Sequence, residues 1–192
     1  MFNPRPTVSQ VAIGDGARCI VLDDALEDPQ TLIDLAGKHR EAFTPATGNA
    51  FPGIELPLPG SVVERFSECF AQHARRAMGA RRVLSASGRL SMVTLQPAQL
   101  APIQRVCHRD RLAAADDQCV GAGVLYLFRD EALGGTNFFG AREPPDAINA
   151  RMRHWSTIDN AQFTQETGWP AAYMTRSNQH FERTAVAPPR FN

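Results

Sequence analysis

The second half of the chain contains short apolar segments separated by proline and glycine, and this pattern constrains the fold most. The unbroken apolar run in Gly123–Phe128 predicts a strand buried on both faces, whereas alternation in Arg89–Gln96 predicts a half-buried strand. Two further segments, Thr136–Gly140 and Phe181–Pro188, also have the composition of strands. Strands of this length and spacing favour a curled sheet, either a barrel or a double sheet.

Helices are expected in the first half of the chain. Asp28 followed by Pro29 is a good helix start and predicts a helix over residues 29–40. Ser61 is the expected cap of a second helix over residues 61–78, in which apolar residues recur at helical spacing. Because helices precede most of the strands, the predicted fold class is α+β.

The chain is long enough for one domain with a substantial core, and we expect a single domain over residues 1–192. Residues 1–88 are predicted to form a helical support region, which includes a short buried strand at 18–22. Residues 44–59 are rich in proline and glycine and are expected to form an extended loop. Residues 89–192 then form the strand-rich core.

An insertion is expected at about residues 141–180, where no regular pattern is visible. Two interpretations remain open for this long segment. It covers the mouth of an active site, or it is a surface excursion held down by Trp155 and Trp169.

Composition restricts the classes of partner. The 20 acidic residues balance the 20 basic ones, so the net charge predicts no attraction to nucleic acid or to a membrane. The basic cluster HARRAMGARR is expected to be a solvated helix end. No cysteine belongs to a C-x-x-C pair, and the sequence has neither an apolar signal segment nor a membrane span. We therefore expect a soluble, reduced, cytoplasmic protein.

His108 and Asp110 are the first candidates for chemistry. Residues two apart on a strand point to the same side, so both side chains are expected to project together, with Cys107 and Arg109 facing away. One imidazole and one carboxylate make up two-thirds of the two-His-one-carboxylate triad that holds non-haem Fe(II). An H-x-D pattern also arises from a simple His–Asp hydrogen bond or from chance.

The residues that follow extend the pattern. H-R-D, then V-L-Y-L-F, then L-G-G-T-N-F-F resembles the core of the Fe(II)/2-oxoglutarate-dependent dioxygenases, in particular the prolyl-hydroxylase-like branch. The flanking segments PGIELPLPG, PAQLAPIQRVCHRD and VAPPRFN are similar to an uncharacterised bacterial group of that superfamily. The similarity spans about residues 51–192, and the motifs lie within Ile103–Phe139.

The resemblance implies a double-stranded β-helix (jelly roll), Fe(II) bound by His108 and Asp110, and 2-oxoglutarate as co-substrate. In that reaction 2-oxoglutarate is split to succinate and carbon dioxide while a C–H bond of a small molecule or peptide is oxidised. Tyr126 matches the tyrosine of the Y-L strand, from which it would contact the co-substrate, and Asn137 is either a polar group of the same pocket or a turn residue. Gly134 and its neighbouring glycine are expected to serve the turn geometry.

The third metal ligand is not evident. The resemblance places the distal His just beyond Asn192, so the chain is expected to stop before it and to leave the jelly roll incomplete. Within the chain, His180 is the better substitute and His154 the other. Two functions therefore stay open: an oxygenase, and a non-catalytic jelly-roll module that retains part of the site. With only two ligands, we expect weak Fe(II) binding and slow or absent turnover; a zinc hydrolase is a distant third possibility.

Overall fold

The computed structural model of the protein describes residues 2–46, 49–110 and 121–192. Seven β-strands and four α-helices lie within these residues. The strands are β1 (Thr7–Gly14), β2 (Ala17–Asp23), β3 (Thr44–Pro45), β4 (Gly53–Pro57), β5 (Arg89–Val93), β6 (Thr136–Ala141) and β7 (Phe181–Ala187). The helices are α1 (Gln30–Lys38), α2 (Gly60–His73), α3 (Pro145–Trp155) and α4 (Asn160–Thr167).

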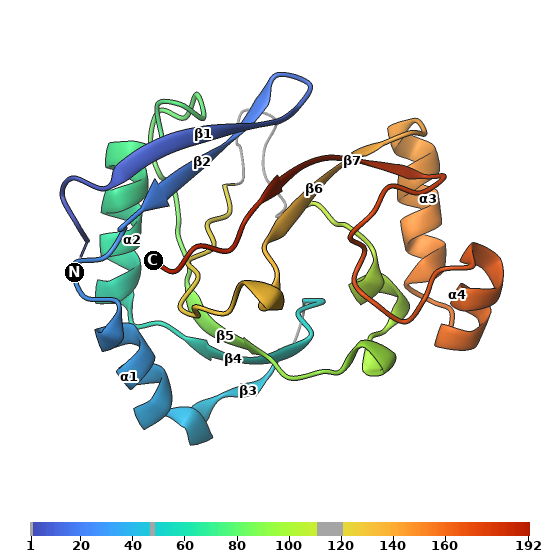
Figure 1. Ribbon diagram of the computed structural model, residues 1–192, viewed down its shortest axis with the longest axis horizontal. Coiled ribbons are helices and arrows are strands. Elements are labelled where there is room, and N and C mark those ends of the chain that lie inside the picture. Colours follow the sequence, from blue (N-terminus) through green and yellow to red (C-terminus); the bar gives the residue numbers. More distant parts are fainter. Residues whose placement is uncertain (1, 47–48, 111–120) are drawn as a thin grey trace.

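The strands form three small antiparallel sheets, with the orders β1-β2, β3-β4-β5 and β6-β7. Figure 1 shows β1–β2 beside β6–β7 on one side of the molecule and β3–β4–β5 on the other, with α1 and α2 at one end and α3 and α4 at the opposite end. The Thr184 hydroxyl on β7 donates to the Ile13 carbonyl on β1 over 2.7 Å, which joins the first two sheets. The class is therefore mixed α/β with small antiparallel sheets.

The order of elements differs from the expected helices followed by strands. A strand hairpin opens the chain, and four of the seven strands, β1 to β4, precede residue 88. The predicted strand at 18–22 is confirmed as part of β2, but its partner β1 was missed because residues 7–14 are mostly polar or small and largely exposed. The first 88 residues are thus not mainly a helical support region.

The predicted loop over residues 44–59 is wrong in part, because β4 runs through it and is the central strand of its sheet. Ile54 pairs with Met92, and Leu56 with Leu90, on the confirmed strand β5. The proline and glycine residues lie at the ends of β4, where they do not interrupt the pairing. Because proline and glycine are abundant here, the sequence did not predict this five-residue strand.

β6 and β7 confirm two predicted strands. Thr136 pairs with Ala187 and Phe138 with Ala185, and a bulge follows between Phe138 and Phe139. Gly135 lies just before β6, at a point where its backbone comes close to the end of β7. The double glycine therefore has two functions: Gly134 has φ +82°, as the predicted turn requires, and Gly135 permits close approach.

Within the part of the chain that the structure describes, the predicted strand Gly123–Phe128 is not formed, because residues 121–130 pair with no described strand. Val124 is 68% exposed, and the following four residues are half-buried, so burial on both faces is also wrong. The carbonyl of Tyr126 instead accepts a hydrogen bond from the Asn192 N–H over 2.9 Å. An apolar run indicates burial but does not supply partner strands.

Both predicted N-terminal helices are present, with different starts. α1 begins at Gln30, one residue later than predicted. The Gln30 N–H donates to the Asp28 carboxylate over 3.0 Å, so Asp28 still accepts a hydrogen bond from the start of the helix. α2 begins at Gly60 after Pro59, without a side-chain cap, so the predicted cap at Ser61 is wrong.

The segment 141–180 contains α3 and α4, which build the aromatic core of the molecule. Trp155 and Phe163 are fully buried and meet edge to face at 5.6 Å, and Trp169 lies 5.4 Å from Trp155. The two tryptophans therefore join this segment to the core rather than leaving it as a surface excursion. Val106 and Phe181 complete the cluster.

The two ends of the described chain lie near each other (Figure 1), and both form hydrogen bonds with residues 25 and 26. The Asn192 side chain accepts the Leu26 N–H over 2.8 Å and donates to the Leu26 carbonyl over 2.9 Å. Asn3 donates its backbone N–H to Ala25 over 2.9 Å. No helix among the described residues is long and apolar enough to cross a membrane.

Candidate functional site

The segment that carries His108 is anchored to the aromatic core. Arg105 is buried and donates to the Leu100 carbonyl over 3.2 Å and to the Thr164 hydroxyl on α4 over 3.3 Å. Val106 is part of the core cluster, and Cys107 packs against it. His108 therefore lies two residues after Val106, which the core holds in place.

Cys107 packs against the core cluster. Burial raises the pKa of its thiol to about 11, although the charge of Arg109 partly opposes this effect. The thiol stays protonated near neutral pH, so Cys107 is neither a thiolate nucleophile nor a ready metal ligand.

His108 and Asp110 project together, as predicted, although they are not on a strand. His108 Nε2 lies 3.6 Å from Asp110 Oδ1, too far for a hydrogen bond. The two side chains are 68% and 55% exposed. The backbone here belongs to no ladder, so the i, i+2 geometry of an extended chain is enough to place them side by side.

The pair suits a divalent metal ion. Neighbouring ligands on a metal with bonds of about 2.1 Å lie about 3 Å apart. The observed 3.6 Å separation therefore needs only a small side-chain movement. Both groups are exposed and neither is held by another described residue, so their lone pairs remain accessible to an ion. A neutral imidazole and a carboxylate are donors that Fe(II) accepts.

Tyr126 and the T-N-F-F motif come together in space. The Tyr126 hydroxyl and the Thr136 hydroxyl are 2.6 Å apart, so one donates to the other. Asn137 is half-buried on β6 and pairs with Val186. Within the described residues, no hydrogen bond or ion pair links Tyr126 or Asn137 to His108 or Asp110.

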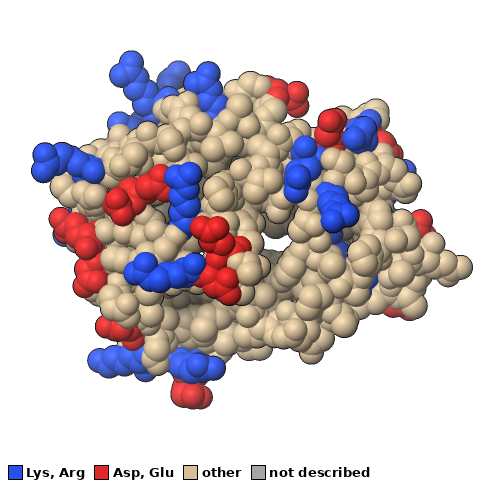
Figure 2. Space-filling view, in the orientation of Figure 1, with Lys and Arg blue, Asp and Glu red and all other residues tan. Residues whose placement is uncertain are grey.

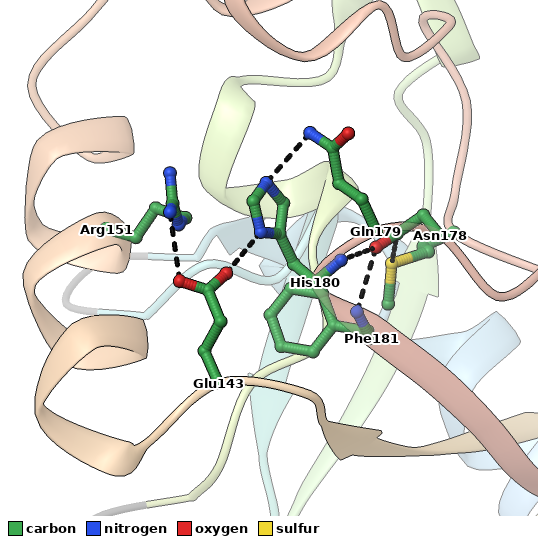
Figure 3. A network of polar contacts seen from close by, with 7 residues as sticks. Glu143, Arg151, Asn178, Gln179, His180 and Phe181 are labelled. Atoms are coloured by element: carbon green, nitrogen blue, oxygen red, sulfur yellow. Dashed lines mark hydrogen bonds and ion pairs between the residues drawn. The ribbon is translucent and has the colours of Figure 1, made fainter.

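His180 lies in a polar network of its own, shown in Figure 3. Its Nδ1 forms a very short hydrogen bond with Glu143 Oε1, and the second oxygen of Glu143 pairs with Arg151 over 2.9 Å. His180 Nε2 lies 3.0 Å from the Gln179 amide nitrogen. The buried imidazole ring contacts Trp155, with centroids 5.6 Å apart.

The other candidate ligand, His154, lies on α3 and pairs with Glu166 of α4 over 2.9 Å. In the part of the chain that the structure describes, no group of three or more His, Cys, Asp or Glu side chains is placed to hold a metal. The structure thus brings His108 to Asp110 but places neither His180 nor His154 with them.

Glu143 and Arg151 are the residues that the sequence did not predict. Glu143 follows β6, Arg151 is on α3, and His180 precedes β7, so the network joins three elements around the aromatic core. The Arg151 hydrogen bond, and then the His180 hydrogen bond, hold the pKa of Glu143 below its ordinary value. The network has the form that orients an imidazole, with one ring nitrogen bound to a carboxylate.

We expect Glu143→Gln to flatten the acid side of the pH–stability profile. Because the folded-state pKa of Glu143 is lowered, its contribution to stability is fully present above the unfolded-state pKa and is lost as pH falls through the lowered folded value. Urea unfolding from neutral pH to below pH 4 measures this difference. Glu131→Gln, an exposed control, should leave the profile unchanged. Parallel profiles for Glu143→Gln and wild type would contradict the account.

The possible anchors for a co-substrate carboxylate are three arginines. Arg190 pairs with Asp23 over 2.7 Å, and Arg183 donates to the Thr175 carbonyl over 2.7 Å. Arg176 is exposed and has no ion-pair partner among the residues described. Arg176 therefore keeps its full hydrogen-bonding capacity.

Fold and site together define a mixed α/β protein whose exposed His–Asp pair extends from an aromatic core. The chain matches the model of a family of unknown function (DUF6445) over residues 4–192, and it belongs to that family. No curated protein and no solved structure shows significant similarity to it.

Proposed function

We propose that the protein is an Fe(II)/2-oxoglutarate-dependent oxygenase of a small molecule or peptide. The observation that carries this proposal is the exposed His108–Asp110 pair, with its donor atoms 3.6 Å apart. The sequence resemblance between H-R-D…L-G-G-T-N-F-F and the dioxygenase core supports it.

In this proposal His108 and Asp110 would hold the iron, and the bound iron would supply the oxygen chemistry that couples oxidation of 2-oxoglutarate to that of the substrate. The protein's own contribution is to place an imidazole and a carboxylate on one side of a short exposed segment that Arg105 and Val106 anchor. Two protein donors leave positions free for a chelating co-substrate. Arg176 is the best candidate to pair with its far carboxylate, because Arg183 and Arg190 are already engaged.

The finer fold expectation belongs to the same proposal. A jelly roll consists of two facing groups of antiparallel strands. The arrangement in which β1–β2 and β6–β7 lie opposite β3–β4–β5 supports this expectation (Figure 1). Figure 2 shows a hollow near the centre of this face, between the two groups.

The assay for this function is succinate formation from 2-oxoglutarate in the presence of Fe(II) and oxygen. We expect a slow reaction that Asp110→Ala abolishes. Asp130→Ala is a matched control, because Asp130 is also exposed and caps a short 3₁₀ helix. Equal succinate formation by wild type and Asp110→Ala would contradict the proposed site.

A second candidate is a non-catalytic binding module. The observation that favours it is that His180 Nδ1 and Nε2 both have partners in the structure, so His180 does not complete a triad in this arrangement. A folded protein that binds the metal but forms no succinate with a broad panel of substrates would select this candidate.

A further inference from the structure

A surface separate from the His–Asp pair has a strong local excess of positive charge. The sequence between Glu68 and Asp110 contains no acidic residue. Seven arginines lie in this interval, but Arg105 is buried, Arg89 pairs with Glu55, and Arg109 stands between His108 and Asp110. The other four, Arg75, Arg76, Arg81 and Arg82, form a local basic region that the neutral net charge of the chain does not reveal.

The backbone after α2 presents these arginines in a defined turn. The Met78 N–H donates to the Ala74 carbonyl over 3.0 Å, and the Ala80 N–H donates to the Arg75 carbonyl over 3.0 Å. Gly79 has φ +68°, which reverses the chain. The Arg75 guanidinium donates to the Arg81 carbonyl over 3.1 Å and closes the turn. We call residues 75–84 the basic turn.

Three of the four guanidinium groups in the basic turn are free to meet a partner. Arg76, Arg81 and Arg82 are exposed, and none forms an ion pair within the described residues. Figure 2 shows basic side chains gathered at the upper left of the molecule, over the end of α2 and the segment after it. Of the acids on α2, Glu68 is already paired with Arg65 over 3.3 Å, and Glu64 adds a single negative charge, so the excess charge near the four arginines remains positive.

Exposed apolar side chains lie between the arginines. Met78 is 41% exposed, Val83 38% and Leu84 57%. Val83 also lines a shallow groove with Leu58 and Val63, and Glu64 and Glu68 lie along the same groove. Exposed apolar side chains that cluster with positive charge are typical of segments that enter the headgroup region of a membrane.

We propose that the basic turn docks the protein on an anionic lipid surface. The arginines would meet the lipid headgroups, and Met78, Val83 and Leu84 would enter the interface. A nucleic acid is the less suitable partner, because residues 71–88 contain no Phe, Tyr or Trp to stack on bases. This surface is independent of the proposed oxygenase site, and its local charge explains why the net charge did not predict it.

Co-sedimentation of the full chain with lipid vesicles tests the proposal. Vesicles of phosphatidylcholine alone are compared with vesicles of equal parts phosphatidylcholine and phosphatidylglycerol, at low and high ionic strength. We expect binding only to the anionic vesicles, and weaker binding at high ionic strength. The triple variant Arg76→Gln, Arg81→Gln, Arg82→Gln should bind about a hundredfold more weakly. The matched control Lys38→Gln, Arg40→Gln, Arg153→Gln removes the same charge elsewhere and should bind like wild type.

A second variant separates insertion from charge attraction. Val83→Ser with Leu84→Ser keeps every arginine, and we expect it to weaken binding about tenfold. Circular dichroism of each variant checks that it is folded. Equal binding by wild type and the arginine variant, or no binding to anionic vesicles, would overturn the proposal. Arginine-dependent binding to duplex DNA without vesicle binding would assign the surface to nucleic acid instead.

Discussion

Replacing Phe163 by alanine is expected to lower the free energy of unfolding by about 3–5 kcal/mol. Phe163 has no exposed surface and packs against both Trp155 and Trp169, with ring centroids 5.6 and 5.7 Å apart. The smaller side chain leaves a cavity that these rigid rings cannot fill. For a domain of this size the melting temperature should fall by roughly 10 °C, as measured by calorimetry or circular dichroism.

Tyr173→Ala is the control for this prediction. Tyr173 is 42% exposed, so its removal should change the free energy of unfolding much less. If Phe163→Ala and Tyr173→Ala have equal effects, α4 does not contribute to a common core, and the anchoring of the His108 segment through Arg105 loses its basis.

Gly135→Ala is expected to destabilise the protein by about 3 kcal/mol through a backbone clash. A Cβ atom at this position would lie 2.1 Å from the Ala187 carbonyl oxygen and 2.9 Å from Pro189 N. Both of these are backbone atoms, so β6 and the end of β7 must separate to make room. Denaturant unfolding measures the loss.

The matched control for this substitution is Gly123→Ala. No heavy atom lies within 4 Å of a Cβ built there, so this variant should be neutral or slightly more stable. An unchanged stability in Gly135→Ala would show that the close approach of the two strands is wrong.

Alternation of polar and apolar residues before Pro97 predicted β5, and the composition of two further segments predicted β6 and β7. All three predicted segments lie within a few residues of the observed strand ends. β4 was missed because Gly53 and Pro57 dominate its composition, although both lie at its ends. Gly123–Phe128 shows the opposite case, because its apolar character indicates burial but does not supply a partner strand.

The segment that forms α3 and α4 contains local sequence signals for helix ends. Asp159 accepts the Gln162 N–H over 2.8 Å, and Gly168 ends α4 in the left-handed region. An Asp followed three residues later by Gln, with a glycine after the last turn, is a recognised pattern of helix ends. This pattern is present in the sequence, but the polar composition of the segment did not indicate a helix.

The contacts of the candidate site also differ in whether the sequence alone predicts them. The adjacency of His108 and Asp110 follows from local backbone geometry, so spacing alone was enough to predict it. The pairing of Glu143 with His180 joins residues 37 positions apart, and only the tertiary fold brings them together. No local pattern in one sequence indicates such a contact.

The central claim is that His108 and Asp110 hold a divalent metal ion together with 2-oxoglutarate, and calorimetric titration with Mn(II) under anaerobic conditions tests it directly. Mn(II) accepts the same nitrogen and oxygen donors as Fe(II) and resists oxidation. Wild type should bind one ion weakly and bind it more tightly with 2-oxoglutarate present, whereas His108→Ala and Asp110→Ala should show neither effect. His73→Ala, which alters a histidine at the end of α2, should titrate like wild type. Identical titrations of wild type and the His108→Ala, Asp110→Ala double variant would contradict the claim.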